Sequence, residues 1–246
     1  MRTLIGFTYA AYAQAHIDIR SVCQLIYVAY VKEETMAHKP RSEMIAETRA
    51  KLIKAARQAF GTVGYAAASM DEFTAEAGLT RGALYHHFGG KEGLLRAVIV
   101  EIDAEMSERL NGVAESYEDP WQGFVAECVG YIEMALEPEI QRIMLLDGPA
   151  VLGDPYKWPH QTGCIRSLSQ SLTRLEEAGL LKFFDAEATA RVINGASLHA
   201  SLWIANADDP AAVSKRAVAA FKRLLEGLRM WNCVPDSPVM PNADGQ

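Results

Sequence analysis

Arginine, tyrosine, histidine and lysine side chains are concentrated between residues 78 and 95, in the sequence GLTRGALYHHFGGKEGLL. These side chains could bind a metal ion, form a catalytic dyad or contact DNA. His86 and His87 are adjacent, so on a helix they point about 100° apart, whereas chelating pairs on helices are three or four residues apart. The chain also lacks the Gly-x-Ser-x-Gly pattern of a nucleophile elbow. The sequence therefore predicts neither a metal site nor a catalytic site, and it favours a nucleic-acid contact.

Two short helices joined by a tight turn are expected to position these side chains. Ser69 and Glu72 form a capping box at the start of the first helix. Gly78 ends that helix and can adopt the positive φ that a sharp bend needs. Thr80 is placed to cap the second helix, over residues 81–88. This spacing is typical of a helix-turn-helix.

The second of these helices should present a polar face. Leu84 and Phe88 are four residues apart, so they share one face and must pack inward. Arg81, Tyr85 and His86 are then left pointing outward or sideways. Arginine can pair with O6 and N7 of guanine, histidine can bond a base edge or a phosphate, and a tyrosine hydroxyl can donate to a phosphate. A helix of this kind is suited to the major groove of DNA.

Small residues and a lysine complete the expected surface. Gly82 and Ala83 let the helix backbone come close to whatever it faces. Lys91 opens the next helix, where a cation opposes the helix dipole. A lysine becomes favourable there if the free helix amides and its ammonium hold a phosphate together. We therefore expect DNA contacts from Thr80, Arg81, Gly82, Ala83, Tyr85, His86 and Lys91.

The segment FTAEAGLTRGALYHHFGGKEGLL closely resembles the N-terminal DNA-binding domain of TetR-family (TetR/AcrR-like) transcriptional regulators. It meets the family pattern A-x-x-A-G-[VL]-[ST]-x-G-x-[LI]-Y-x-[HY]-F-x-x-K-x-x-L at almost every position, and the resemblance extends over about residues 47–107. The resemblance implies that the residues just named touch DNA, and that Ser69 and Met70 begin a helix lying across the DNA backbone. Asp71 is a departure, since a carboxylate close to phosphates is unfavourable and should point away from DNA.

Charge is distributed unevenly along the chain. The formal net charge of −7 argues against a general polyanion binder. Residues 37–100 carry nine Lys or Arg against six Asp or Glu, whereas residues 101–246 carry 12 against 22. The asymmetry predicts a small part that faces DNA and a larger part with a different task.

The cysteine and hydropathy patterns indicate in which cellular compartment the protein functions. The four cysteines, Cys23, Cys128, Cys164 and Cys233, are scattered and include no C-x-x-C pair, which is typical of a reduced, cytoplasmic protein. No segment has 18 consecutive uncharged apolar residues, so we expect no membrane span. We expect no cofactor either.

The first 35 residues admit three interpretations. The beginning of the chain imitates a secretory signal with a small-residue cleavage site at Ala13-Gln14-Ala15, although polar residues dilute its apolar run. Lys32-Glu33-Glu34 can be encoded by a purine run resembling a ribosome-binding site just ahead of Met36, so translation could begin there. Residues 17–31 could instead form a genuine helix. We expect residues 1–35 to be a non-native or disordered extension, with the native start left open.

The remaining chain predicts an all-α fold. An amphipathic helix over residues 44–63 precedes the helix-turn-helix, and a long helix begins at Lys91. Residues 148–159, rich in glycine and proline, are expected to form a loop. We expect a three-helix DNA-binding domain, a larger helical ligand-binding and dimerisation domain, and a disordered tail, over residues 42–92, 93–232 and 233–246.

The last two long helices are expected to pair with those of a second subunit, as the resemblance implies. The helix after Pro210 carries an apolar stripe too wide for solvent, and the helix before it is apolar nearly all round. A two-fold dimer predicts a near-palindromic operator with half-sites about 34–36 Å apart. The dimerisation candidates are Ala196, Ala200, Ala217, Phe221, Leu224 and Leu228.

A ligand pocket is expected among the middle helices. Methionine and aromatic residues at helical spacing are more often plain core, but polar groups among them need a partner. A pocket lined mostly by methionine, leucine and aromatic residues favours a hydrophobic small molecule, which could be aromatic. The candidates are Tyr131, Met134, Met144, Asp147, Trp158, His160, Asn194, His199 and Trp203.

These patterns together predict a ligand-responsive, sequence-specific DNA-binding regulator, in which the ligand tilts the long helix and releases DNA. The alternative is an architectural or activating DNA-binding protein of the same fold that senses no small molecule. An enzyme is disfavoured, because no nucleophile–base pair or metal cluster is apparent. The ligand, the operator sequence and the choice between repression and activation stay open.

Overall fold

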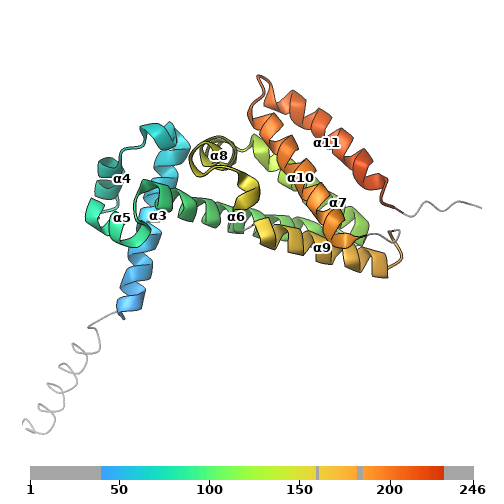
Figure 1. Cartoon of the computed structure of the whole chain (residues 1–246), viewed down its shortest axis with the longest axis horizontal. Coiled ribbons are helices and arrows are strands. Elements are labelled where there is room, and N and C mark those ends of the chain that lie inside the picture. The colour runs from blue at the N-terminus through green and yellow to red at the C-terminus, as the bar shows by residue number, and fades with distance from the viewer. Residues whose placement is uncertain (1–39, 159–160, 182–184, 230–246) are drawn as a thin grey trace, which may run out of the picture. The chain divides into compact units, whose positions relative to one another are not determined.

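The structure is a computed structural model (Figure 1). It describes residues 40–158, 161–181 and 185–229. The chain divides into two units, the second of which begins at Ala50. Residues 40–49 are the described part of the first unit and contain the start of α3, and all contacts given below belong to the second unit. The expectations for residues 1–35 and for the tail from residue 233 fall outside the described residues.

The described residues form helices and no β-strand, which confirms the all-α class. The α-helices are α3 (Arg41–Ala67), α4 (Met70–Glu76), α5 (Arg81–Phe88), α6 (Lys91–Glu115), α7 (Pro120–Glu133), α8 (Gly148–Leu152), α9 (Gln161–Glu177), α10 (Ala186–Ala205) and α11 (Pro210–Glu226). Short 3-10 turns cover Met134–Leu136 (η1) and Pro155–Lys157 (η3), and a π-helix covers Ile140–Asp147 (η2).

Local capping groups start the helices of the helix-turn-helix, as expected. The Ser69 hydroxyl accepts a hydrogen bond from the Glu72 amide at 3.4 Å, at the start of α4. The Thr80 hydroxyl accepts one from the Ala83 amide at 3.2 Å, at the start of α5. Gly78 has a φ of 66°, which only glycine adopts without strain, so it permits the tight turn between the two helices.

The first helix breaks at Gly64, where the sequence predicted its end. Gly64 has φ 82° and ψ 162°, so α3 is interrupted by a kink before its last three residues. The Tyr65 amide donates to Asp147 Oδ2 at 2.7 Å, far along the chain. A Cβ atom at Gly64 would collide with the Arg142 guanidinium. Glycine is therefore needed here for both its backbone angles and its small size.

The expected loop at residues 148–159 is wrong in its first half. The π-helix η2 runs directly into α8 at Gly148, and non-helical chain begins only at Gly153. Pro149 has no amide hydrogen, so it donates no hydrogen bond back to η2 at the junction of the two helices. A Cβ atom at Gly148 would lie 2.7 Å from Trp158 Cη2, so this glycine lets the buried indole cover the helix. Tertiary packing thus keeps a glycine–proline pair helical.

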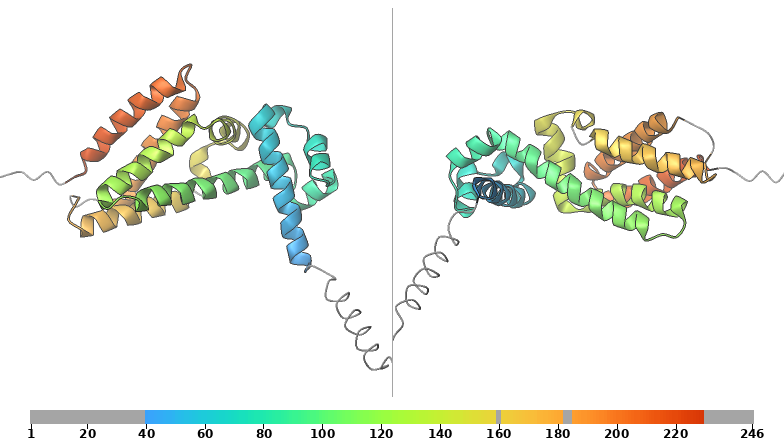
Figure 2. Two further views of the ribbon diagram at one scale, coloured as in Figure 1. Left: turned by 180° about the vertical axis from the view of Figure 1, so that it is seen from behind. Right: turned by 90° about the horizontal axis from the view of Figure 1, so that it is seen from below.

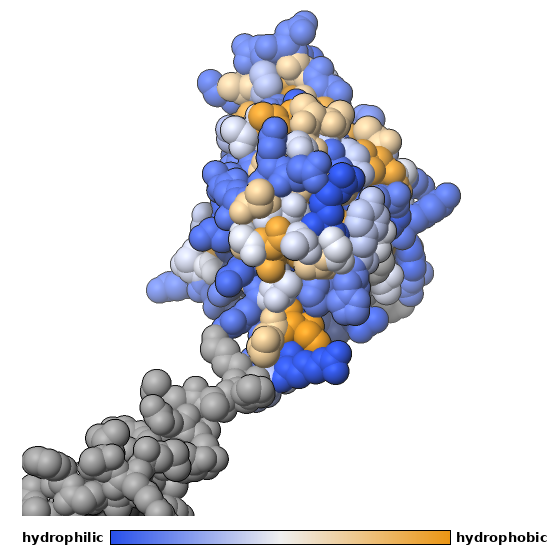
Figure 3. Space-filling model, turned by 90° about the vertical axis from the view of Figure 1, so that its left-hand side faces the viewer, coloured by the Kyte–Doolittle hydropathy of each residue, from blue (hydrophilic) through white to orange (hydrophobic). Residues whose placement is uncertain are grey.

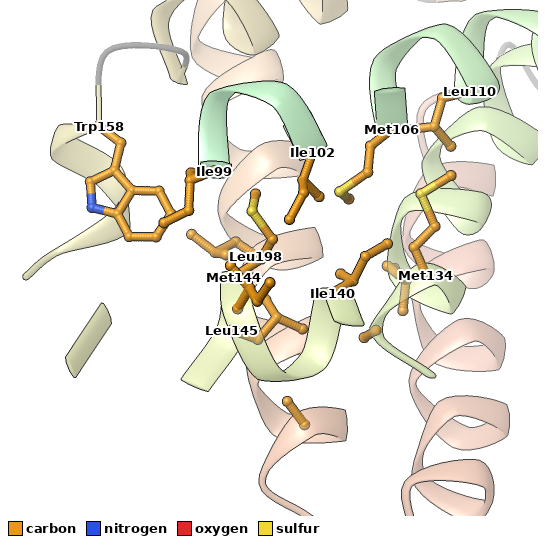
Figure 4. Packing of buried hydrophobic residues seen from close by; sticks show 14 of the residues in the cluster. Ile99, Ile102, Met106, Leu110, Met134, Ile140, Met144, Leu145, Trp158 and Leu198 are labelled. Atoms are coloured by element: carbon orange, nitrogen blue, oxygen red, sulfur yellow. The ribbon is translucent and has the colours of Figure 1, made fainter. Parts of the chain in front are cut away.

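The core is one continuous cluster of buried apolar side chains that follows α6. Leu84 of α5 and Leu94 of α6 are fully buried, and they belong to the same cluster as the buried apolar residues of α3 and α4. Further along α6, Ile102 and Met106 face side chains of η1, η2 and α10 (Figure 4). The helix α10 packs against α7, α9 and α11 (Figure 2). Because α6 contacts both α5 and α7, it joins the helix-turn-helix to the C-terminal helices.

Candidate nucleic-acid interface and cavity

The outward face of α5 carries the residues that the sequence singled out. Leu84 is fully buried, which leaves the opposite face of this two-turn helix in solvent. Arg81, Gly82, Tyr85 and His86 are exposed, with Tyr85 half accessible at 50%. The α4–α5 end of the molecule faces the viewer in Figure 3, where hydrophilic residues cover most of the surface. The side chains of Arg81, Tyr85 and His86, all on α5, are therefore accessible to a partner.

The Thr80 hydroxyl can cap α5 and donate a hydrogen bond to a partner at the same time. Its oxygen accepts the Ala83 amide hydrogen and so caps α5. The hydroxyl hydrogen is still able to donate, because a threonine hydroxyl is both donor and acceptor. Ser69 caps α4 in the same way, and Met70 packs partly against the core. The capping residues of α4 and α5 therefore also have chemistry suited to phosphate oxygens.

Arg81 pairs with Asp71, the residue that departs from the family pattern. Arg81 Nη1 lies 3.4 Å from Asp71 Oδ2, and the two side chains are 50% and 70% exposed. An exposed ion pair of this kind contributes little stability, so it can exchange for a stronger partner. Asp71 thus orients a guanidinium at the beginning of α5.

Lys91 has a partner inside the protein, which the sequence did not foresee. Its Nζ lies 4.6 Å from the centre of the Tyr65 ring, in a cation–π contact. Partial burial lowers the pKa of Lys91, and the charge of Asp147 opposes this shift. Gly90 begins α6 with no side-chain cap, so the amides at this helix start lack a capping group. The position of Lys91 therefore has a structural explanation beside the expected phosphate contact.

An arginine with three carboxylates joins α3 to the C-terminal helices. Arg57 Nη1 and Nη2 lie 2.6 and 2.7 Å from the two oxygens of Glu105, and its Nε lies 2.7 Å from Glu139 Oε1. Glu101 is a third partner, at 3.2 Å. The hydrogen bonds that Arg57 donates to Glu139 and Glu105 raise the pKa of Arg57, and those to Glu105 lower the pKa of Glu105. We call Arg57, Glu101, Glu105 and Glu139 the arginine cluster.

Asp147, expected in the ligand pocket, lies at this junction instead. Its Oδ2 accepts hydrogen bonds from the Tyr65 amide at 2.7 Å and from Arg142 Nε at 3.2 Å. It does not line the cavity described next. A carboxylate is useful at this position because the kink in α3 leaves the Tyr65 amide without a partner in its own helix, and Asp147 accepts its hydrogen bond.

A cavity of about 350 Å³ lies between α6, α7, α9 and α10. Met106, Leu110 and Leu168 form its aliphatic wall. The other lining residues are mostly polar rather than the methionine, leucine and aromatic residues that the sequence predicted, but apolar atoms still make up most of the surface that faces the cavity. The other lining residues are Asp103, Ser107, Asn111, Glu127, Cys128, Tyr131, Gln161, Gly163, Cys164, Ser167, Asn194 and Ser197.

The structure places the nine ligand candidates in different surroundings. Tyr131 and Asn194 line the cavity, and Met144 and Trp158 line an adjoining space of about 20 Å³. Met134 is buried in the core. His160 falls outside the described residues. Two further candidates, His199 and Trp203, are exposed on α10 and do not line the cavity.

The acidic lining residues were missed because acidic residues on helices usually face solvent. Asp103 precedes Met106 and Leu110 by three and seven residues, which places it on the inner stripe of α6. Glu127 is half-buried between Phe124 and Tyr131, which are three residues before it and four after it. Helical spacing relative to apolar residues was the signal that could have found both carboxylates.

The dimerisation candidates fall into two groups. Ala200, Ala217 and Phe221 are buried within their own chain, because the inner half of the α11 stripe packs on α7 and α10. These three are core residues of the single chain, and a part for them in an interface stays a prediction. Leu224 is 67% exposed, and Ala196 and Leu228 are half-buried.

An outward stripe on α10 was not recognised in the sequence. Val192, Ala196, His199 and Trp203 follow one another at spacings of four, three and four residues, so they share one face of the helix. Val192 is 72% exposed and Trp203 is 43% exposed, although both are large and apolar. Arg216 of α11 lies over the Trp203 ring, 5.4 Å from its centre. We call these four residues of α10 the outer stripe.

No helix within the described residues is long and apolar enough to cross a membrane.

Comparison with known proteins agrees with the helix-turn-helix. Residues 52–98 match the profile of bacterial regulatory proteins of the tetR family, and residues 121–228 match the tetracyclin repressor-like C-terminal domain. The solved structure of a TetR-family transcriptional regulator from Pectobacterium atrosepticum is similar, with 47% identity and a TM-score of 0.73. The similarity covers 78% of this chain and 99% of that one.

Two curated proteins extend this similarity. The TetC protein of transposon Tn10 from Escherichia coli is 23% identical, over 77% of this chain and 96% of its own length. The transcriptional repressor AcnR from Corynebacterium glutamicum is 31% identical, over 41% of this chain and 52% of its own length. The name of AcnR and both profiles describe regulators of transcription, not enzymes. With its N-terminal helix-turn-helix and C-terminal helical domain, the chain belongs to the TetR family of transcriptional regulators.

Proposed function

We propose that this chain is a repressor that binds a near-palindromic operator as a homodimer and leaves it when a small molecule enters the cavity. The observation that carries the proposal is the course of α6. This one helix packs against α5 at its beginning and lines the cavity with Asp103, Met106 and Leu110 further along. A change at the cavity can therefore reach the DNA-facing helix through a single rigid element.

The DNA contacts proposed are those of the exposed α5 face and the two helix starts. Arg81 would exchange Asp71 for a guanine edge, since a bidentate pair with guanine is stronger than an exposed ion pair. The caps Thr80 and Ser69 would donate to phosphates, with Met70 close to the backbone. Gly82 and Ala83 would allow close approach, and the contacts are completed by Tyr85, His86 and Lys91.

The homodimer would form through the outer stripe of α10 and the exposed edge of α11. Spacings of four and three residues are those of helices that pack along a shared seam. Val192 and Leu224 together expose large apolar side chains that a second copy would cover. The buried candidates Ala217 and Phe221 would support this face from inside rather than form it.

Repression with release by a ligand is supported by the cavity and by one relative. AcnR is described as a repressor. A cavity of about 350 Å³ is at the lower end of the range for small-molecule sites. The cavity favours a ligand-responsive regulator, because an architectural protein of the same fold would need no space for a ligand in its core. The ligand shifts the equilibrium only by its preference for the DNA-free state.

The test is fluorescence anisotropy with labelled DNA from immediately upstream of the gene, titrated with protein begun at Met36 and repeated with the full chain. Random DNA serves as competitor. We expect binding that resists the competitor, with two chains on each operator. Binding that the competitor abolishes for both forms would contradict a specific operator at this locus, and site selection from random DNA then decides whether one exists elsewhere.

A further inference from the structure

The cavity is lined by two neutral polar side chains from neighbouring helices. Asn194 comes from α10 and Tyr131 from α7, and these two helices pack against each other. Asn194 is only 8% exposed, so its amide group lies inside the protein rather than at its surface. Tyr131 also lines the adjoining space of about 20 Å³, which places it where the two spaces meet. Both side chains are therefore within reach of a molecule in the cavity.

The hydrogen bonds of these two side chains leave each with capacity for a ligand. Asn194 Nδ2 donates to Gln161 Oε1 at 2.9 Å, so the amide nitrogen is engaged and the carbonyl oxygen forms the other end of the group. Within the described residues, this is the only hydrogen bond of the Asn194 side chain, and the Tyr131 hydroxyl makes none. A carbonyl oxygen accepts hydrogen bonds, whereas a tyrosine hydroxyl can donate one. A ligand with both a donor and an acceptor would therefore satisfy both groups.

The surroundings of these groups favour an uncharged ligand over a charged one. Apolar atoms make up most of the surface that faces the cavity. Burial is the largest cause of a raised pKa at four lining residues, which are Glu127, Cys128, Tyr131 and Cys164. In each case burial favours the uncharged form, and a charged group on a ligand would lose its hydration in the same way. Asp103 does not by itself call for a cation, because it already has an interaction partner in the protein.

We propose that the cavity binds an uncharged amphipathic molecule that carries a hydroxyl or carboxamide group. That group would donate a hydrogen bond to the Asn194 carbonyl oxygen and accept one from the Tyr131 hydroxyl. The apolar body would lie against the aliphatic wall of Met106, Leu110 and Leu168, of which Figure 4 shows Met106 and Leu110 on α6. The inference rests on the proposed function in taking this cavity as the effector site.

The test is isothermal titration calorimetry on the full chain, without DNA. The probes have a 3-phenylpropyl or an octyl body, and each body is offered with a hydroxyl, a carboxamide, an ammonium or a carboxylate group. We expect at least one alcohol or amide to bind about tenfold or more tightly than both charged molecules with the same body, because only the charged groups lose a full hydration shell. Equal or tighter binding of the charged molecules, or no binding by any alcohol or amide, would overturn the proposal.

Matched variants locate the polar group of the ligand. Tyr131→Phe and Asn194→Ala should each weaken binding of the tightest alcohol or amide about fivefold or more. The corresponding methyl ether or dimethylamide cannot donate a hydrogen bond, so Asn194→Ala should leave its affinity unchanged. Tyr156→Phe and Asn206→Ala are the controls, because both residues are exposed and neither lines the cavity. Circular dichroism checks that all four variants fold, and unchanged affinity in both cavity variants would place the ligand elsewhere.

DNA binding separates this inference from the proposed function. If operator binding is found and every alcohol and amide fails to bind, only the inference about the ligand is wrong. If one of them binds in the cavity and leaves operator affinity unchanged, the ligand class stands and the proposed release of DNA by that molecule is wrong. Anisotropy with the molecule at about ten times its measured dissociation constant distinguishes these cases.

Discussion

At the scale of single residues, Arg81 is the side chain that we propose contacts a base. Its exposed pair with Asp71 points the guanidinium from the start of α5 without fixing it strongly. Arg81→Ala should weaken operator binding by about 1–3 kcal/mol and relax selectivity at one base pair of each half-site. Arg96→Ala is the control, because Arg96 is an exposed arginine on α6 that pairs with Glu92 of the same helix at 2.7 Å.

Anisotropy against the operator and its single-base variants measures this prediction. Equal losses for Arg81→Ala and Arg96→Ala would mean that only overall charge matters. Unchanged selectivity in Arg81→Ala would assign base reading to another side chain of α5.

We expect a different contribution to DNA binding from Lys91, because it lies at the start of α6 rather than on the exposed face of α5. Lys91→Ala should weaken binding to all sequences alike and reduce the slope of log K against log salt by about one. Lys91→Arg keeps the charge and should keep the slope. Salt titrations with specific and random DNA measure both. A slope unchanged in Lys91→Ala would leave the Tyr65 contact as the main role of this lysine.

At the scale of elements, the arginine cluster ties α3 to α6 and to the start of η2 through Glu139. Glu105 has a pKa lowered chiefly by its hydrogen bonds with Arg57. A carboxyl with a lowered folded-state pKa stabilises the fold above its unfolded pKa, near 4.5, and this stability is lost as pH falls through the lowered value. Glu105→Gln should therefore be less stable than the wild type at pH 7, by a margin that shrinks below pH 4.5.

Urea unfolding followed by circular dichroism between pH 3 and pH 7 measures this margin. Glu108→Gln is the control, since Glu108 is exposed on the same helix outside the cluster. A margin that does not change with pH would show that Glu105 acts by packing rather than by charge.

Locally determined elements were predictable from the sequence, and those fixed by distant contacts were not. The caps at Ser69, Thr80 and Asp185 depend on a hydroxyl or carboxylate and an amide within three residues, so they could be predicted. The helical Gly148 depends on Trp158, and the position of Asp147 depends on Tyr65, far away in the chain. The exposed face of α5 was predictable for the same reason, because it is determined within eight residues. The cavity was not, because residues of four helices line it.

At the scale of the whole molecule, the outer stripe should hold two copies together. Val192→Asp adds a charge at an exposed apolar position, so it should not unfold the chain, but it should shift the dimer toward monomer and lower operator affinity about tenfold or more. Ala219→Asp is the control, because Ala219 is exposed on α11 and lies about 140° round that helix from Leu224. Sedimentation velocity measures the shift, and a Val192→Asp dimer as stable as the wild type would place the interface elsewhere.

Selection of bound sequences from random DNA by the purified chain tests whether it reads an operator as a two-fold dimer, because every possible operator competes in the same experiment. We expect an enriched inverted repeat whose half-sites are centred about 34–36 Å apart, roughly one turn of DNA. With Arg81→Ala, the same repeat should appear with one position per half-site no longer selected. A library without enrichment, or a single half-site without its inverted copy, would contradict a two-fold dimer that reads DNA through α5.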